Sequence, residues 1–283
     1  MPFTKKMRFA KKKAAEPVQD ENKSAKKAKK MPEREYKTDW LLADMRNIDK
    51  QIYDIVIDFF SRTKAFKLKE LWAELFVAYY VSGARRTELF IIPLSISKLE
   101  HEGETYYKIK KCNLKHFEGR KPRRKIETQI FKAWNQYEKA LFEFLLGGKL
   151  ENTIDFSPLI DINSKHPERK EHFKLAYNGR DNQLDEMMAQ ISFRFSRLFK
   201  ADIVGKDNAK RVNEGLVPHM LRHLRISNLR VEKDIPDSMC QKLFGWDDPA
   251  MVGYYSDVRR SIQEKEEIEI YKRLSQYQQS KPF

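Results

Sequence analysis

The residues best suited to chemistry lie in a short stretch in the last third of the chain, residues 218–223. His219 and Arg222 are three positions apart, so on a helix their side chains leave the same face and can converge on one group. A guanidinium matches the oxygens of a phosphate, and an imidazole exchanges a proton near neutral pH. The pair therefore suits a phosphate as ligand.

A second stretch could supply a nucleophile. Gly245 and Trp246 precede a turn at residues 247–249, where an aspartate can cap a helix that a proline opens. Tyr254 and Tyr255 follow this turn. A phenol there would lie near the arginine of the first stretch.

A third stretch, residues 82–89, places Arg85 at the start of an expected helix, where backbone N–H groups also attract anions. Glu88 follows three residues later, so an ordinary surface salt bridge is the alternative for this arginine. Its position upstream of a His-x-x-Arg motif and a tyrosine makes catalysis the better hypothesis.

In this order the three stretches resemble the catalytic domain of the tyrosine recombinases, the phage-integrase family, over residues 40–270. Arg85 and Glu88 match the family's Gly-x-Arg-x-x-Glu-Leu box. His219 and Arg222 match its His-x-x-Arg box. The ordered set is specific, although each box alone is weak.

The resemblance also assigns the end of the site. Trp246 follows Gly245 where most members have histidine, and a minority use tryptophan as a hydrogen-bond donor. Counting on from the glycine matches the nucleophile to Tyr255, with Tyr254 as the alternative. His223 continues the His-x-Leu-Arg-His pattern, and we expect it to support the site structurally and to point away from the face of the arginine before it.

The family also carries a catalytic lysine on a β-hairpin. Lys115, just before a turn at residues 118–122, is the best match, and Lys111 is the alternative. For any single lysine here, charge that follows the DNA backbone without chemistry is the competing interpretation. The expected DNA contacts are Lys111, Arg123, Arg124, Arg194 and Arg197.

The resemblance implies cleavage and rejoining of DNA strands without metal, cofactor or ATP. Tyr255 would attack a phosphodiester and leave a 3′-phosphotyrosine with a free 5′-hydroxyl. Arg85 and Arg222 would stabilise the transition-state charge. His219 would take the tyrosine proton, and Lys115 would protonate the leaving oxygen. The indole N–H of the tryptophan would bind the phosphate.

The resemblance implies a site-specific recombinase or integrase of a mobile element or virus, acting on double-stranded DNA as a homotetramer. With only two cysteines, the chain is expected in the cytoplasm. The alternatives are relaxation of DNA by a type IB topoisomerase-like enzyme, and a DNA-binding protein without catalysis. Family members usually place a separate helical domain before this one. Here only about 45 ordered residues are expected before Arg85, so that domain is expected to be absent. Either the basic N-terminal arm replaces it, or a partner chain supplies it, or the protein is a reduced integrase.

The composition agrees with a DNA-binding protein. The chain has 283 residues, a net charge of +15 and a pI near 9.5, which favours a polyanionic partner. Cys112 and Cys240 are too few for a disulfide framework or a zinc site, and His166 and His172 lack supporting ligands. The sequence has no apolar run long enough for a membrane span.

The chain divides into segments by composition. Residues 1–38 carry 13 Lys and Arg against 5 Asp and Glu, a net charge of +8, and are expected to form a disordered arm along DNA. Residues 39–258 form the expected catalytic domain, with a polar surface insertion at residues 149–182. Residues 259–283 form a charged helical tail that docks on a neighbouring protomer or on its own domain.

The expected fold class is α+β, mainly α-helical with a small antiparallel β-sheet, and the resemblance implies the fold of DNA breaking-rejoining enzymes. Helical and alternating patterns indicate the elements. Strands are expected at residues 90–96, 106–110 and 125–127. Helices are expected at residues 48–59, 68–76, 131–146, 187–198, 218–229 and 237–243.

Overall fold

The computed structural model describes Leu42 and residues 47–63, 66–115, 123–163, 182–204 and 210–246. These residues belong to one unit, Lys37–Phe283. The basic arm, both candidate tyrosines and the charged tail lie outside the described residues.

Two helices precede the first arginine, as the sequence predicts. α1 (Ile48–Arg62) buries one apolar stripe that includes Ile52 and Phe59, whereas α2 (Lys69–Ser82) is buried on nearly every side. A helix that is apolar all round must lie inside a domain. α2 is therefore the central helix, and the site is built at its C-terminal end.

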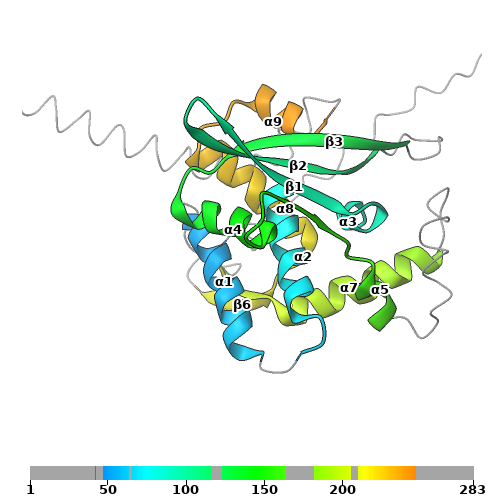
Figure 1. Ribbon diagram of the computed structural model, residues 1–283. Helices are drawn as coiled ribbons and strands as arrows, with labels where there is room; N and C mark the ends of the chain where they lie inside the picture. The colour runs from blue at the N-terminus through cyan, green and yellow to red at the C-terminus, as the bar shows by residue number, and fades with distance from the viewer. Residues whose placement is uncertain are drawn as a thin grey trace, which may run out of the picture. The chain divides into compact units, whose positions relative to one another are not determined.

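A four-stranded antiparallel sheet lies across the helices (Figure 1). Its order is β3-β2-β1-β4, formed by β1 (Leu94–His101), β2 (Glu104–Lys115), β3 (Arg123–Lys132) and β4 (Glu151–Ile154). Glu102 and Gly103 join β1 to β2 with positive φ angles, as a two-residue hairpin turn requires. The structure is thus mixed α/β with a small antiparallel sheet, which confirms the α+β class.

Two expected boundaries are wrong. Phe90 belongs to the short helix α3 (Glu88–Ile91) and not to a strand, and Phe131 is the last residue but one of β3, which ends at Lys132, instead of opening a helix. Phe131 pairs with Tyr107 of β2, and cross-strand aromatic pairs of this kind stabilise a sheet. α4 (Gln136–Leu146) begins only after this strand.

The expected surface insertion at residues 149–182 is also wrong in its first part. β4 pairs with β1, and α5 (Pro158–Asn163) follows it with Leu159 and Ile160 buried. These apolar residues lie in a segment with many polar ones, so the sequence pattern did not predict that they are buried. Residues 164–181 lie outside the described part of the chain.

The remaining elements complete the site. α7 (Asn182–Leu198) leads into a hairpin of β5 (Lys200–Val204) and β6 (Arg211–Gly215), which the sequence did not predict. α8 (Pro218–Ser227) continues into a π-helical turn (Asn228–Glu232), and α9 (Asp237–Leu243) follows. α8 packs against α2. Among the described helices none is long and apolar enough to cross a membrane.

Candidate active site

The structure brings together three of the predicted catalytic residues. Arg85 lies just after α2, whereas His219 and Arg222 lie in the first two turns of α8. The Arg222 NH1 group donates a hydrogen bond to the carbonyl oxygen of Gly83, which joins the two segments. Desolvation, followed by the charges of Arg222 and Arg85, lowers the pKa of His219. The three side chains therefore lie close enough for the two arginine charges to act on the imidazole of His219.

Gly83 permits this close approach. Its φ is +55°, and an added Cβ atom would lie 2.3 Å from the ring of Phe244, just after α9. A left-handed backbone of this kind favours glycine at the end of a helix. The predicted break at this residue is confirmed, and it also makes room for the segment that precedes the candidate nucleophile.

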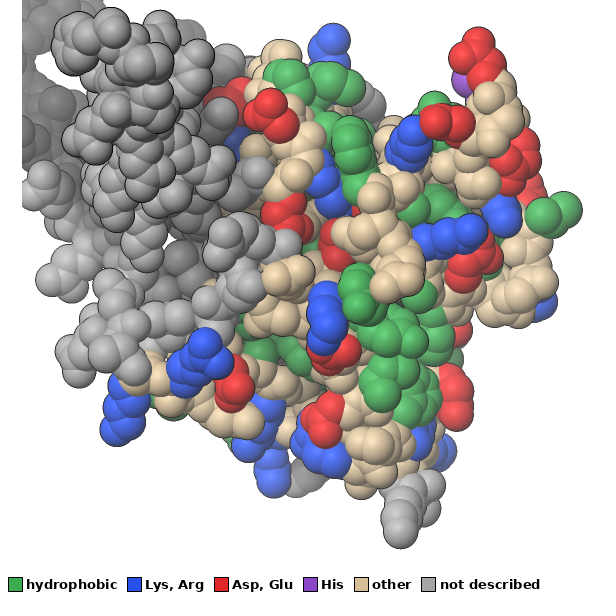
Figure 2. Space-filling model, turned by 90° about the vertical axis from the view of Figure 1, so that its left-hand side faces the viewer, with side chains coloured by type: hydrophobic (Ala, Val, Ile, Leu, Met, Phe, Trp, Pro, Cys, Tyr) green, Lys and Arg blue, Asp and Glu red, His purple; other side chains and the backbone are tan. Residues whose placement is uncertain are grey.

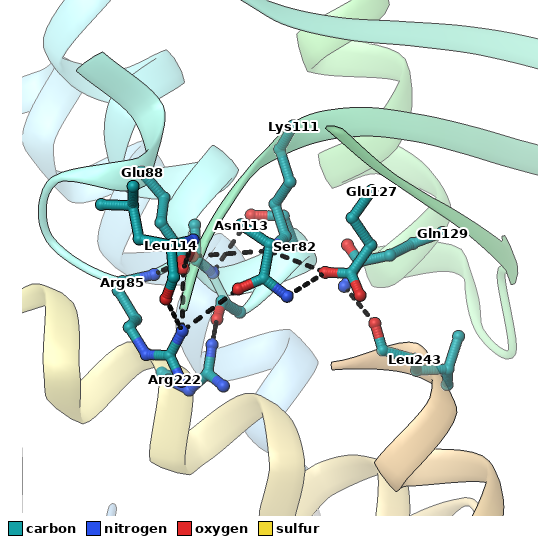
Figure 3. A network of polar contacts seen from close by, with 12 residues as sticks. Ser82, Arg85, Glu88, Lys111, Asn113, Leu114, Glu127, Gln129, Arg222 and Leu243 are labelled. Carbon is teal, nitrogen blue, oxygen red and sulfur yellow. Dashed lines mark hydrogen bonds and ion pairs between the residues drawn. The ribbon is translucent and has the colours of Figure 1, made fainter. Parts of the chain in front are cut away.

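A carboxylate holds Arg85 in place (Figure 3). Glu88 Oε2 accepts from the Arg85 backbone N–H at 2.7 Å, and Glu88 Oε1 accepts from Arg85 NH1 at 3.0 Å. The same NH1 group donates to the Leu114 carbonyl at 2.9 Å and to Asn113 Oδ1 at 3.2 Å. The alternative of a surface salt bridge is wrong, because the Glu88 side chain is 0% exposed.

This arrangement leaves part of the arginine for another group. Among the described residues, the hydrogen bonds of the Arg85 guanidinium all use NH1, and its side chain is 35% exposed. Nε and NH2 form the outer edge of the fork. Arg85 is thus held by one nitrogen and presents the others, which is the geometry for binding an anion.

Lys111 has a different place from the one expected. Its side chain is 1% exposed, and its ammonium lies 3.4 Å from Glu88 Oε2 and 3.5 Å from Glu127 Oε2. Asn113 Nδ2 also donates to Glu127 Oε2, at 3.0 Å. A lysine enclosed by two carboxylates inside the protein does not fit the predicted DNA contact. Lys111 instead joins β2, β3 and α3 beneath Arg85.

The charges around Glu88 keep it ionised. Burial alone would raise the pKa of its carboxyl, but Lys111, Arg222 and Arg85 outweigh this effect and lower the pKa below its ordinary value. A buried carboxylate with three cations is stable only when its oxygens are also hydrogen-bonded. Glu88 therefore organises the site, in line with the supporting role expected for it.

Trp246 covers Arg222 and does not stand beside it as a free donor. Arg222 is 1% exposed, and its guanidinium lies 5.4 Å from the rings of both Phe244 and Trp246. These two rings stack with centroids 5.3 Å apart. The aromatic pair thus holds the guanidinium by cation–π attraction. The predicted N–H bond from Trp246 to a phosphate stays a prediction.

His223 points differently from the expectation. Its Nε2 atom lies 3.0 Å from Nε2 of His219, one helical turn earlier, and the two rings meet at 83°. Desolvation, followed by His219 and Arg222, lowers the pKa of His223 to about 3. Residues four apart share a face of a helix, so His223 supports the site through direct contact with His219.

Several predicted residues are not placed. Tyr254 and Tyr255 lie outside the described residues, as do the side chains of Lys115, Arg123 and Arg124. The backbone of Lys115 pairs with that of Arg123 at the end of the hairpin. The choice of catalytic lysine and nucleophile stays a prediction.

The predicted DNA contacts on α7 also stay predictions. The Arg194 guanidinium lies 5.1 Å from the Phe66 ring and 5.8 Å from Trp72, whereas Arg197 lies over the exposed ring of Phe193 at 5.7 Å. On the side of the molecule shown in Figure 2, basic and acidic side chains are interspersed. No single-sign field marks that side among the described residues.

Asn113, Glu127 and Gln129 also belong to the site, and no motif in the sequence indicates them. One signal was present in the sequence. Successive side chains alternate between the two faces of a strand, so Asn113 lies on the same face of β2 as Tyr107, Ile109 and Lys111. Gln129 Nε2 donates to the carbonyl of Leu243 at 2.5 Å, which ties the sheet to the end of α9.

A second buried charge cluster supports α8 and the turn after it. Arg225 NH1 lies 2.6 Å from Glu138 Oε1 of α4, and Lys233 Nζ lies 2.7 Å from Glu138 Oε2 and 3.2 Å from Asp49 Oδ2 of α1. α8 is therefore fixed by buried ion pairs at Arg225, within two turns of His219 and Arg222.

Comparison with known proteins gives no match. No protein-family model, curated protein or solved structure matches the chain.

Proposed function

We propose that the protein cleaves and rejoins double-stranded DNA through a covalent 3′-phosphotyrosine, as a site-specific recombinase with the tyrosine recombinase catalytic fold. The observation that carries the proposal is that Arg85, Arg222 and His219 lie close enough for their charges to act on one another, with Arg85 held by the buried carboxylate of Glu88. Two arginines and a neutral imidazole suit a phosphodiester better than a neutral substrate.

Each group has a role in this reaction. The outer edge of Arg85 binds a nonbridging oxygen, and Arg222 adds positive charge that stabilises the pentacoordinate transition state. His219 is neutral at pH 7, because its pKa is lowered from 6.5, so it accepts the proton of Tyr255. The phenolate oxygen forms a bond to phosphorus, the bond from phosphorus to the 5′ oxygen breaks, and Lys115 protonates that oxygen.

The bond energy is conserved in the phosphotyrosine, so a 5′-hydroxyl from a second strand reverses the reaction without ATP. Strand exchange between two DNA sites needs several active sites together, and a homotetramer on DNA is part of the proposal. The net charge of +15 supports the DNA as partner.

The test is trapping of a covalent adduct. Purified protein is incubated with a library of nicked duplexes, from which the cleaved strand end diffuses away, and the products are separated on a denaturing gel. We expect a slow-migrating protein–DNA species with the wild type and with Tyr254→Phe, and none with Tyr255→Phe. An adduct that survives in Tyr255→Phe and disappears in Tyr254→Phe would move the nucleophile by one residue.

Arginine variants test the assignment of the phosphate site. Removing a preorganised donor costs about 10²- to 10³-fold in rate, so Arg85→Ala should slow adduct formation by about that factor. Arg86→Ala removes the same charge from the neighbouring position and should have a much smaller effect. If wild-type protein binds every duplex without any adduct, the proposal is wrong. Relaxation of supercoiled plasmid without strand exchange would instead favour a topoisomerase.

A further inference from the structure

Five polar side chains of the candidate site form a closed ring (Figure 3). Arg85 NH1 donates to Oε1 of Glu88, whose Oε2 lies 3.4 Å from the ammonium of Lys111. That ammonium also lies 3.5 Å from Oε2 of Glu127, which accepts from Nδ2 of Asn113 at 3.0 Å. Oδ1 of Asn113 closes the ring by accepting from Arg85 NH1 at 3.2 Å. The ring therefore joins the partly exposed arginine to a carboxylate on β3.

Asn113 is the member that allows the ring to close. Arginine and lysine side chains only donate hydrogen bonds, and an ionised glutamate only accepts them. A ring made of such groups alone needs an even number of members, because donors and acceptors must alternate. This ring has five members, and the amide of Asn113 is the one group in it that both donates and accepts.

The two neighbours of this amide fix its direction. The guanidinium of Arg85 requires the amide oxygen, and the carboxylate of Glu127 requires the amide NH₂ group. Turning the amide over would place two donors together on one side and two acceptors together on the other. Asn113 is 2% exposed, and a buried polar group left without a partner destabilises the protein. Glu127 therefore determines that an oxygen atom faces Arg85.

The chain after α9 encloses this link. An added Cβ atom on Gly245 would lie 2.0 Å from Oε1 of Glu127 and 2.5 Å from Nδ2 of Asn113. Gln129, two positions after Glu127 on β3, donates to the carbonyl of Leu243. The backbone at the end of α9 thus lies directly against the two side chains and restricts their movement.

We propose that Asn113 and Glu127 are positioning residues, which hold NH1 of Arg85 toward the sheet so that Nε and NH2 face an anion. The contribution to catalysis rests on the proposed function, whereas the ring itself does not. Glu88 lies three residues from Arg85 on the same segment, and a bond to the Leu114 carbonyl alone would let the guanidinium pivot about that contact. Asn113 adds a second contact from β2, and Glu127 holds Asn113 from β3.

The first test is spectroscopic and independent of activity. Nitrogen-15 spectra of the full-length protein show the side-chain NH₂ groups of asparagine, and Asn113→Leu identifies the signal of Asn113 by its loss. We expect these hydrogens to exchange slowly with water in the wild type. Glu127→Ala should speed the exchange by about 10- to 100-fold, the factor that a hydrogen bond to a charged group provides. Glu127→Gln should keep it slow, because both contacts end on Oε2, where a Gln oxygen can lie.

The second test uses the trapping assay, with thermal unfolding to show that the variants are folded. Glu127→Ala should slow adduct formation by about 10- to 100-fold, a part of the ~10²- to 10³-fold that a preorganised donor contributes, and Glu127→Gln should recover most of the rate. In protein that already carries Arg85→Ala, Glu127→Ala should cause no further slowing, because its effect passes through the arginine. Glu104→Met, which removes an exposed carboxylate from the same sheet, should leave the rate unchanged.

The possible failures are distinguishable. Equal exchange in the wild type and Glu127→Ala overturns the ring. Equal slowing by Glu127→Ala with and without Arg85→Ala overturns the positioning role, because a general loss of structure acts in both. Asn113→Leu breaks the same link from the other side and repeats the comparison of rates if Glu127→Ala does not fold. Absence of any adduct in the wild type overturns the proposed function, while the exchange spectra still decide the ring.

Discussion

Replacement of Glu88 by glutamine is the sharpest test of how the site is held. The change keeps the shape of the side chain and removes its charge. Glu88 Oε1 accepts from Arg85 NH1 and from the backbone N–H of Leu114 at 3.1 Å, and Oε2 accepts from the Arg85 backbone and from Lys111. Whichever way the glutamine amide is turned, its NH₂ group faces two donors.

The expected cost follows from these contacts. Two hydrogen bonds are lost, and a hydrogen bond to a charged group contributes about 1.5–3 kcal/mol. Lys111, which is 1% exposed, also loses one of its two carboxylates, and breaking a buried ion pair costs about 3–5 kcal/mol. These contributions overlap, so we expect Glu88→Gln to lower the free energy of unfolding by about 3–5 kcal/mol.

The effect should depend on pH in a known direction. The pKa of Glu88 is lowered from its ordinary value of 4.5, so the ionised carboxylate stabilises the folded state above pH 4.5. This stabilisation is lost as the pH falls through the lower folded-state pKa. The difference between wild type and Glu88→Gln should therefore be largest near neutral pH and should narrow below pH 4.5.

The assay is reversible urea unfolding followed by tryptophan fluorescence at several pH values. Glu102→Gln is the matched control, because its side chain is 85% exposed, and it should change the free energy by less than about 1 kcal/mol. A loss below about 1 kcal/mol in Glu88→Gln, or a difference that does not narrow in acid, would refute the account of Glu88 as the buried anchor of Arg85.

Two further substitutions test the packing around the site by the same unfolding measurement. Gly245→Ala should lower the free energy of unfolding by about 2–4 kcal/mol, because its φ is +61° and the new Cβ would lie 2.0 Å from Glu127 Oε1; an unchanged midpoint would contradict that close approach. Arg225→Met should cost about 3–5 kcal/mol, since it leaves Glu138 buried with one cation fewer. Lys50→Met, which removes an exposed ion pair, should cost less than about 1 kcal/mol, and equal costs would contradict the difference in burial.

The sequence predicted the helices better than the strands. α9 was predicted with its observed bounds, and α1 and α2 were predicted close to theirs, because apolar residues recur at three and four positions in each. The hairpin of β5 and β6 was missed, since each strand is only five residues long and β6 is mostly polar. A short strand forms only when it pairs with a partner strand, and the pattern of the few residues within the strand does not reveal that partner.

The same reason explains the misplaced end of β3. Phe131 and the residues after it have helical spacing, and only the cross-strand contact with Tyr107 makes Phe131 part of the sheet. The strand in the first part of the expected insertion was missed for the same reason. This strand, β4, is defined by pairing with β1, about fifty residues earlier in the chain.

For the site, the sequence by itself determined the residue types and the local spacings. The His-x-x-Arg motif on α8, the break at Gly83 and the Arg85–Glu88 pair all follow from positions within a few residues of one another, where helix geometry fixes which side chains can meet.

Only the tertiary structure decided burial and partnership. Lys111 was expected to meet DNA, yet it lies between Glu88 and Glu127, and Trp246 covers Arg222 with Phe244. The local sequence around a lysine does not show whether water or two carboxylates surround its side chain. Its environment is set by which strand and helix faces pack together, and for Lys111 these faces bring in carboxylates 23 and 16 positions away in the chain.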